Sequence, residues 1–233
     1  MTENKTIVRF TLNERIQHIV AMIAFIVLFL TGFALKYSDN SVSGWLIQLL
    51  GGMENRSSMH YEGGILLIAV GVYHILYLLL TVRGRDQLRR LFFHTSDWKA
   101  FCVSFTHIFS SKRPDTPHGR FTTRQKLQFW LVMGGSLSMG VSGLLIWFHD
   151  ETMSLFSKWF WDFLFILHSH GAMLVFLVIV LWHLYDIHLR EAFPMDNSWL
   201  SGRLSLERLK QEHSLEYQEL MAAGQIDGEE DEN

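Results

Sequence analysis

The chain has 233 residues, of which 49% are apolar and 14% aromatic, and its formal net charge is −3. Its single cysteine, Cys102, excludes an internal disulfide, a CxxCH haem-attachment motif and cysteine ligation of an iron–sulfur cluster. The apolar residues concentrate in four segments that could each cross a bilayer, which takes about 20 residues. A soluble protein would not expose four such segments. We therefore predict an all-α membrane protein, a four-transmembrane-helix bundle with interfacial helices.

The first helix is expected to begin at Asn13, a suitable N-cap, and the second near Ser57. Between them, residues 41–51 (SVSGWLIQLLG) are too short to span and are expected to form an interfacial helix that the Gly51-Gly52 pair ends. The predicted spans lie at about 16–36, 59–82, 126–148 and 160–187, within a membrane domain of residues 1–195 that precedes a polar, acidic cytoplasmic tail of residues 196–233.

The distribution of positive charge predicts how the spans are oriented. All but three of the 20 Lys and Arg residues lie in the N-terminal segment, in the loop after the second span, or after the fourth span; the exceptions are Lys36, Arg56 and Lys158. The positive-inside rule then places both termini and the long loop in the cytoplasm. Residues 88–109 of that loop alternate basic and aromatic groups and are expected to lie along the membrane surface. That position favours lipid head groups over nucleic acid as the partner.

The third span carries several glycines that have two possible roles. Small residues let neighbouring backbones approach closely within a membrane, and they can equally make room for a flat macrocycle. The sequence leaves both roles open for Gly134, Gly135, Gly140 and Gly143.

Histidines recur at matched positions within the spans. A histidine inside a membrane span is costly and indicates a functional site. His60 and His74 are 14 residues apart, which places them on one helix face about 21 Å apart along the axis. In the fourth span, His168 precedes His183 by 15 residues with about 60° of rotation between them, and His170 precedes it by 13 with about 140°.

The depths of these histidines suggest two metal sites. His60 and His168 are expected near the outer surface, whereas His18, His74 and His183 are expected near the inner surface and compete for two positions. Paired histidines on facing helices are how membrane proteins hold b-type haem. Zinc is disfavoured, because its ligands would cluster at one depth with acidic or cysteine co-ligands. The histidines of the loops and tail are expected to be solvated: His94, His107, His118 and His213.

Sequence elements spread over essentially the whole chain carry a family resemblance. They are Arg9-Phe10 followed by NERIQH, a first helix ending in LTG at Thr31-Gly32, the His60 region, GRFTTRQKLQFW at 119–130, and ILHSHGAM followed by WHLYDIHL. With these elements the chain resembles the dihaem cytochrome b (gamma) subunit of membrane-bound formate dehydrogenases and the related cytochrome b of nickel–iron hydrogenases.

The resemblance implies a set of haem ligands. By position, His18 and His183 would ligate an inner haem b, and His60 and His168 an outer one, which leaves His74 without a role as a ligand. The family spacing on the fourth helix is 14 residues, whereas here it is 15 or 13, so His170 stays an alternative to His168.

The resemblance also implies a quinone site beside the inner haem. Its neighbourhood would hold His18, Thr122, Arg124 and Gln125, with Thr122 where formate dehydrogenase subunits carry an asparagine. Judged without the resemblance, Thr122 and Gln125 are predicted to cap the third helix.

The predicted function is transfer of electrons across a bacterial inner membrane, from an iron–sulfur partner to menaquinone or ubiquinone. The chain has no catalytic triad or nucleotide loop, so a separate catalytic subunit would act on formate or hydrogen. One alternative is a quinol-oxidising cytochrome b that passes electrons to a c-type cytochrome. The other is a haem-free transporter subunit in which the histidines relay protons.

Overall fold

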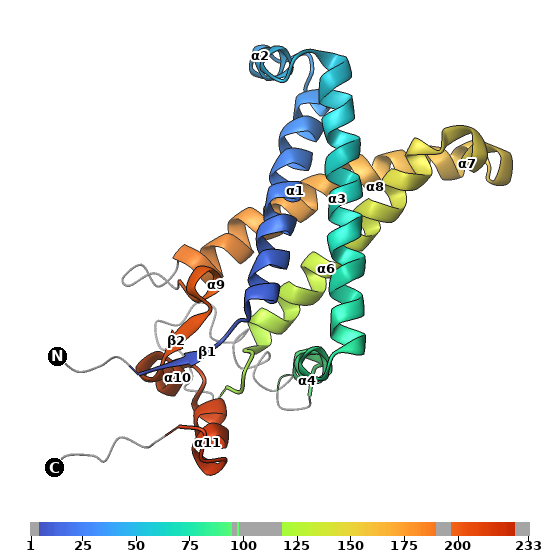
Figure 1. Ribbon diagram of the computed structural model, residues 1–233. Coiled ribbons are helices and arrows are strands. Elements are labelled where there is room, and N and C mark those ends of the chain that lie inside the picture. The colour runs from blue at the N-terminus through green and yellow to red at the C-terminus, as the bar shows by residue number, and fades with distance from the viewer. Residues whose placement is uncertain (1–4, 95–96, 98–117, 190–196, 227–233) are drawn as a thin grey trace, which may run out of the picture.

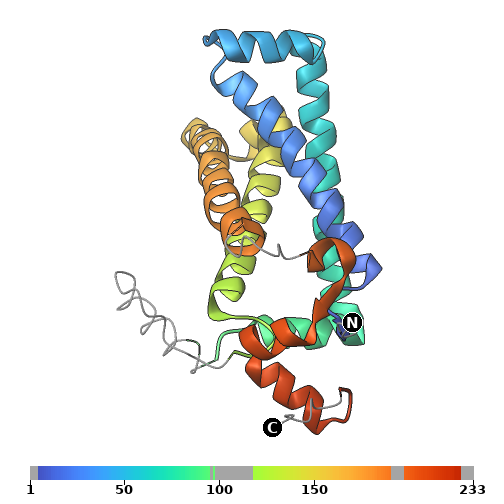
Figure 2. The ribbon, with the colours of Figure 1, turned by 90° about the vertical axis from the view of Figure 1, so that its left-hand side faces the viewer.

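The computed structural model describes residues 5–94, 97, 118–189 and 197–226. Its four membrane-length apolar helices pack as two hairpins, α1 along α3 and α6 along α8, and the second hairpin crosses the first at an angle (Figures 1 and 2). The predicted all-α, four-span membrane architecture is confirmed. The helices are α1 (Leu12–Lys36), α3 (Met53–Leu80), α6 (Thr123–Trp147) and α8 (Lys158–Leu177), which continues as the π-helix η1 (Val178–Leu189).

Helix α1 begins earlier than the sequence predicted. Thr11, not Asn13, is its N-cap: the Thr11 hydroxyl accepts from the Glu14 amide at 3.3 Å, and the Glu14 carboxylate accepts from the Thr11 amide at 2.7 Å. This reciprocal capping box satisfies two backbone donors, which a single asparagine cap would not do. The Asn13 side chain instead accepts a hydrogen bond from the Tyr73 hydroxyl of α3.

Helix α2 (Ser41–Leu49) forms the predicted interfacial helix and lies across the end of the α1–α3 hairpin (Figure 1). Gly51 and Gly52 follow it with φ angles of 86° and 99°, which only glycine adopts readily. Helix α3 begins directly after them at Met53, not near Ser57. The predicted start of α3 was too late because most of its first residues are polar, and hydropathy detects only the apolar part of a helix.

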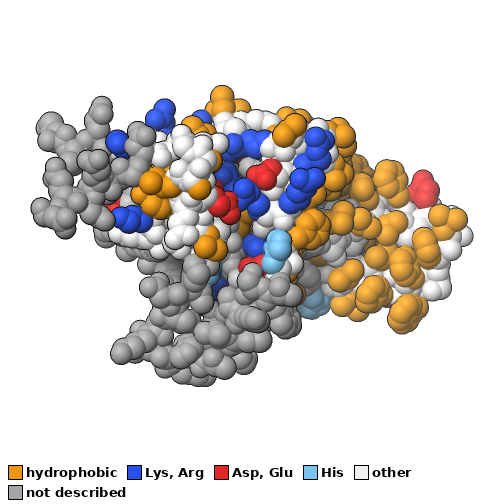
Figure 3. Space-filling view, turned by 90° about the horizontal axis from the view of Figure 1, so that it is seen from below, with side chains coloured by type: hydrophobic (Ala, Val, Ile, Leu, Met, Phe, Trp, Pro, Cys, Tyr) orange, Lys and Arg blue, Asp and Glu red, His pale blue; other side chains and the backbone are white. Residues whose placement is uncertain are grey.

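The chain folds into a cap at the opposite end of the bundle, which we define as residues 5–11 and 197–226. Strands β1 (Thr6–Val8) and β2 (Arg203–Ser205) pair antiparallel, so the two ends of the described chain meet here (Figure 1). Seen from this end of the molecule, Lys and Arg side chains gather near the middle of the view (Figure 3). The cap also contains the short helices α9 (Ser198–Ser201), α10 (Leu206–Glu212) and α11 (Ser214–Ala222). Helix α4 (Val82–Leu91) lies at the same end of the bundle. Helix α7 (His149–Leu155) joins α6 to α8.

A buried ionic cluster joins both parts of the cap to the segment that precedes α6. Glu216 of α11 is 4% exposed and binds Arg9, which follows β1, as well as Arg120, whose Nη1 lies 2.9 Å away. Residues 198–222 therefore form ordered elements within the segment expected to be a polar tail. The acidic end of that tail, 227–233, and most of the surface segment 88–109 lie outside the described residues.

His213 is buried in this cluster, so the expectation that it is solvated is wrong. It is 3% exposed, and its Nδ1 lies 2.7 Å from the Gly119 carbonyl oxygen. Burial and the adjacent Arg9 guanidinium lower the pKa of His213 to about 4. Its neighbours come from the N-terminus and from the segment before α6, contacts that no local sequence pattern reveals.

Acidification is expected to destabilise the cap through His213. Its folded-state pKa is about 4 against an ordinary 6.5, so between these values the unfolded chain binds a proton that the folded chain does not. Stability therefore falls as pH drops from about 6.5 toward 4, by up to about 3 kcal/mol. Melting temperatures in detergent at pH 7.5 and pH 5 should differ more in the wild type than in His213→Gln. Equal pH dependence in the two proteins would contradict this role.

Candidate functional site: two facing histidine pairs

Four of the predicted histidines face one another in two pairs. His60 of α3 and His168 of α8 have ring centres 6.3 Å apart, and we call them the distal pair. His18 of α1 and His183 of η1 have ring centres 6.2 Å apart, and we call them the cap pair because they lie toward the cap. Each pair thus draws one ring from each helical hairpin.

The separation within each pair fits one metal ion held between two imidazoles. A metal–imidazole bond is about 2.0 Å long and the ring centre lies about 1.1 Å beyond the nitrogen, so two rings on opposite sides of one iron have centres about 6.2 Å apart. Both observed distances match this value. Among the described residues no three His, Cys, Asp or Glu side chains cluster as a metal site. Two histidines per metal suit haem, whose porphyrin supplies the other ligands.

Hydroxyl groups on neighbouring helices orient both rings of the distal pair. Thr31 Oγ1 of α1 lies 2.8 Å from His60 Nδ1, and Ser142 Oγ of α6 lies 3.0 Å from His168 Nδ1. Each hydroxyl has one proton, which it donates to a backbone carbonyl four residues earlier, at 2.6 Å for Thr31 and 2.7 Å for Ser142. With that assignment of the hydroxyl protons, Nδ1 donates in both contacts. The lone pair of each ring stays on Nε2, where a metal can take it.

A glycine follows each of these hydroxyl residues and lets the ring approach its helix. A Cβ built on Gly32 would lie 3.3 Å from His60 Cε1, and one on Gly143 would lie 3.0 Å from His168 Cε1. Gly143 therefore makes room for a candidate ligand. Gly135 and Gly140 instead contact Val175 and Ile68 on neighbouring helices, so they serve helix packing. A Cβ on Gly134 would meet nothing within 4 Å. Close helix packing is thus found at Gly135 and Gly140, and room for a flat macrocycle stays a prediction.

The π-helix η1 accounts for the 15-residue spacing on the fourth span. In an α-helix this spacing would rotate His183 about 60° away from the face of His168. The wider turn of a π-helix rotates less per residue, so it absorbs the extra residue. His183 consequently faces His18, and Trp199 of α9 lies beside His18 as well, with the two ring centres 6.2 Å apart.

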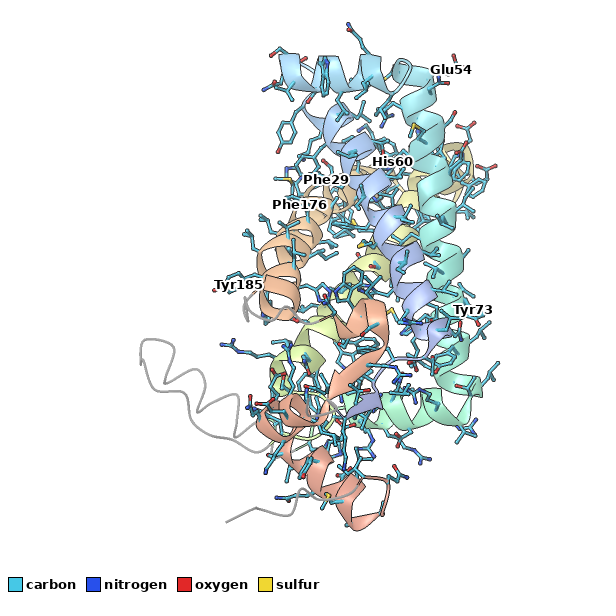
Figure 4. The ribbon with its side chains drawn as sticks, turned by 60° about the vertical axis from the view of Figure 1, so that its left-hand side comes forward. Phe29, Glu54, His60, Tyr73, Phe176 and Tyr185 are labelled. Atoms are coloured by element: carbon cyan, nitrogen blue, oxygen red, sulfur yellow. The ribbon has the colours of Figure 1, made fainter. Side chains whose placement is uncertain are left out.

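An aromatic contact fixes the two hairpins against each other between the pairs. Phe29 of α1 and Phe176 of α8 stack with ring centres 4.1 Å apart and planes 3° apart (Figure 4). Phe176 lies between His168 and His183 in the sequence, and Phe29 lies between His18 and Thr31, so this stack joins α1 and α8 at a depth between the two pairs.

The two alternative histidines lie outside the pairs. His74 Nδ1 is 2.7 Å from Gln17 Oε1, a contact between α3 and α1, and its ring lies beside Tyr77 and Phe129. His170 is exposed, and its Nδ1 lies 3.3 Å from the Ile166 carbonyl oxygen of its own helix.

The residues expected near a quinone stand at the start of α6. Thr122 is the N-cap: its hydroxyl accepts from the Gln125 amide at 3.3 Å, and the Gln125 side chain accepts from the Thr122 amide at 2.9 Å. The predicted capping role of both residues is confirmed. Arg124, between them, is exposed.

Sequence reasoning missed Thr31 and Ser142. The available signal was a repeated dipeptide, a small hydroxyl residue followed by glycine, at Thr31-Gly32 and Ser142-Gly143. Its significance depends on which histidine faces it, and that is a property of helix packing.

Residues 9–200 match the model of the prokaryotic cytochrome b561 family, which is most of the chain. The chain belongs to this family. It is 26% identical over 186 residues to the formate dehydrogenase cytochrome b556(fdo) subunit of Escherichia coli strain K12, covering 79% of this chain and 80% of the relative. It is 22% identical over 205 residues to the formate dehydrogenase cytochrome b556 subunit of Haemophilus influenzae, covering 88% and 76%.

Family membership confirms the predicted resemblance to formate dehydrogenase cytochrome b. The protein is a bacterial membrane cytochrome of the b type that acts in electron transfer. This conclusion favours a haem protein over the haem-free proton relay.

Proposed function

We propose that this cytochrome holds two haem b groups, one at each histidine pair, and carries electrons from the distal pair to a quinone at the cap end. The observation that carries the proposal is the geometry of the pairs, with ring centres 6.3 and 6.2 Å apart at two positions along the bundle. When bound, haem supplies reversible one-electron chemistry. The protein's part is to fix the imidazoles, and two histidines bound to one haem iron would leave it no position for oxygen chemistry.

The proposed orientation places the cap in the cytoplasm. Lys and Arg side chains gather at the end of the molecule where the cap lies (Figure 3), as the positive-inside rule expects of a cytoplasmic surface. The distal pair then lies toward the periplasm, where the donor would dock. The relatives are named as formate dehydrogenase subunits, which supports a complex with an iron–sulfur subunit and a catalytic dehydrogenase or hydrogenase subunit.

The quinone, menaquinone or ubiquinone, is proposed to bind near the cap pair, beside the start of α6. Reduction of a quinone to a quinol consumes two electrons and two protons, so this site needs contact with water. The exposed Arg124 lies at such a place, whereas the Thr122 and Gln125 side chains are bonded to the helix start. Support for the quinone site comes from the resemblance together with this position.

Rapid mixing tests the proposal. The purified protein, reduced and freed of reductant, is mixed with a short-chain menaquinone or ubiquinone while the haem absorbance is followed. We expect reoxidation of two haems for each quinone reduced, and slower reoxidation in Arg124→Ala. The exposed Arg85, on α4 at the same end, supplies the control Arg85→Ala. No reaction with either quinone, combined with reduction of the oxidised protein by quinol, would support the quinol-oxidising alternative.

A further inference from the structure

Arg56 is a buried cation near the start of α3, one turn before His60. The residue is 6% exposed. Its Nη1 donates to the Thr31 carbonyl at 3.0 Å, its Nη2 donates to the Ser57 hydroxyl at 2.6 Å, and its Nε is buried with no hydrogen-bond partner. Among the residues that the structure describes, no carboxylate forms an ion pair with it.

A buried guanidinium that meets only neutral groups is costly. Removing a charge from water is compensated only by an opposite charge and by hydrogen bonds to its donors. Arg9 in the cap shows the usual arrangement, because it is equally buried and binds the Glu216 carboxylate. Arg56 has no such partner in the described chain, so its position calls for an anion from elsewhere.

Contacts through Thr31 connect this cation to the distal pair. Arg56 donates to the Thr31 carbonyl, and the hydroxyl of the same residue accepts from His60 Nδ1. We propose that Arg56 binds a propionate of the haem held by His60 and His168, an inference that rests on the proposed function. A guanidinium with an unused Nε–H suits a carboxylate, since arginine can bind both carboxylate oxygens at once.

The proposal has a consequence for electron transfer. Reduction of a haem lowers its charge by one, and a nearby positive charge stabilises the state that has gained the electron. Arg56 therefore raises the midpoint potential of the distal haem and leaves that of the cap haem unaffected, because the latter lies about 20 Å away along the bundle.

Redox titration of charge variants tests this inference. At a fixed potential, Arg56→Gln is expected to raise the ratio of oxidised to reduced distal haem by about tenfold or more. Arg56→Lys should raise this ratio by no more than about twofold. Lys158→Gln is the control, since it removes an exposed charge that pairs with Asp162 at the same end of the bundle, and it should shift neither haem.

Failure of the proposed function and failure of the role of Arg56 would give different results. Wild-type protein without a distal haem would refute the proposed function itself. Arg56→Gln with both haems bound and an unshifted distal midpoint would overturn the role of Arg56 alone, as would an equal shift in Lys158→Gln. If Arg56→Gln does not assemble, resonance Raman spectra of Arg56→Lys decide: the propionate band of the distal haem should move, and an unchanged band would overturn the proposal.

Discussion

Replacement of His60 or His168 by alanine is expected to remove one haem of two, halving the haem content per chain. Both rings would hold the same iron, since their centres are 6.3 Å apart on facing helices. The double variant should therefore lose no more haem than either single one. His18→Ala and His183→Ala should each remove the other haem, because those rings form the cap pair. Pyridine haemochrome assays of the purified variants measure the content.

His74 and His170 provide matched controls for this series. His74 Nδ1 bonds to Gln17 between α3 and α1, and His170 is exposed. Alanine at either position should leave both haems in place. A loss of haem in His74→Ala with full retention in His18→Ala would contradict the assignment of the cap pair.

Loss of the hydroxyl groups behind the distal pair is expected to weaken haem binding 10- to 100-fold. Thr31→Val and Ser142→Ala each remove the acceptor of an Nδ1–H bond, so the ring loses both its fixed orientation and its preferred tautomer. Loss of that bond also makes the imidazole a weaker electron donor to iron, which should raise the midpoint potential of the distal haem. Transfer of haem to apomyoglobin measures the first effect, and redox titration the second.

Thr152→Val is the control for these two variants. Thr152 is 2% exposed and, like Thr31, donates its hydroxyl proton to a backbone carbonyl, that of Leu145. Among the described residues, its hydroxyl forms no hydrogen bond with a histidine. Retention of wild-type haem binding in Thr31→Val and Ser142→Ala would show that the hydroxyls do not position the rings. The sign of the potential shift separates these variants from Arg56→Gln, for which a decrease is expected.

The sequence predicted the four spans because membrane insertion depends on the length and hydropathy of local segments. It also predicted which histidines share a depth, since depth follows from spacing along a helix. It left open whether His168 or His170 is the ligand on the fourth span, because the π-helix that turns His183 toward His18 has no clear local signature in the sequence. Packing of the hairpins decides that question, and it separates His74 from the cap pair as well.

The cap was not predicted, and neither was the role of the buried cations. Arg9 and Glu216 are 207 residues apart in sequence, and each appears in a polar segment that resembles an ordinary solvated end. Helices α10 and α11 are short, and isolated helices of this length are marginal in water. Long-range ion pairs and strand pairing stabilise this region, and neither leaves a periodic pattern in one segment.

A redox-titrated visible spectrum of the purified protein, with haem counted per chain, tests the two-pair account most directly. The account predicts two b-type haems with separate midpoint potentials, because the distal pair has hydroxyl partners and Arg56 beside it whereas the cap pair lies against Trp199. A single haem per fully assembled chain would contradict it, since only one of the two pairs could then be a ligand pair.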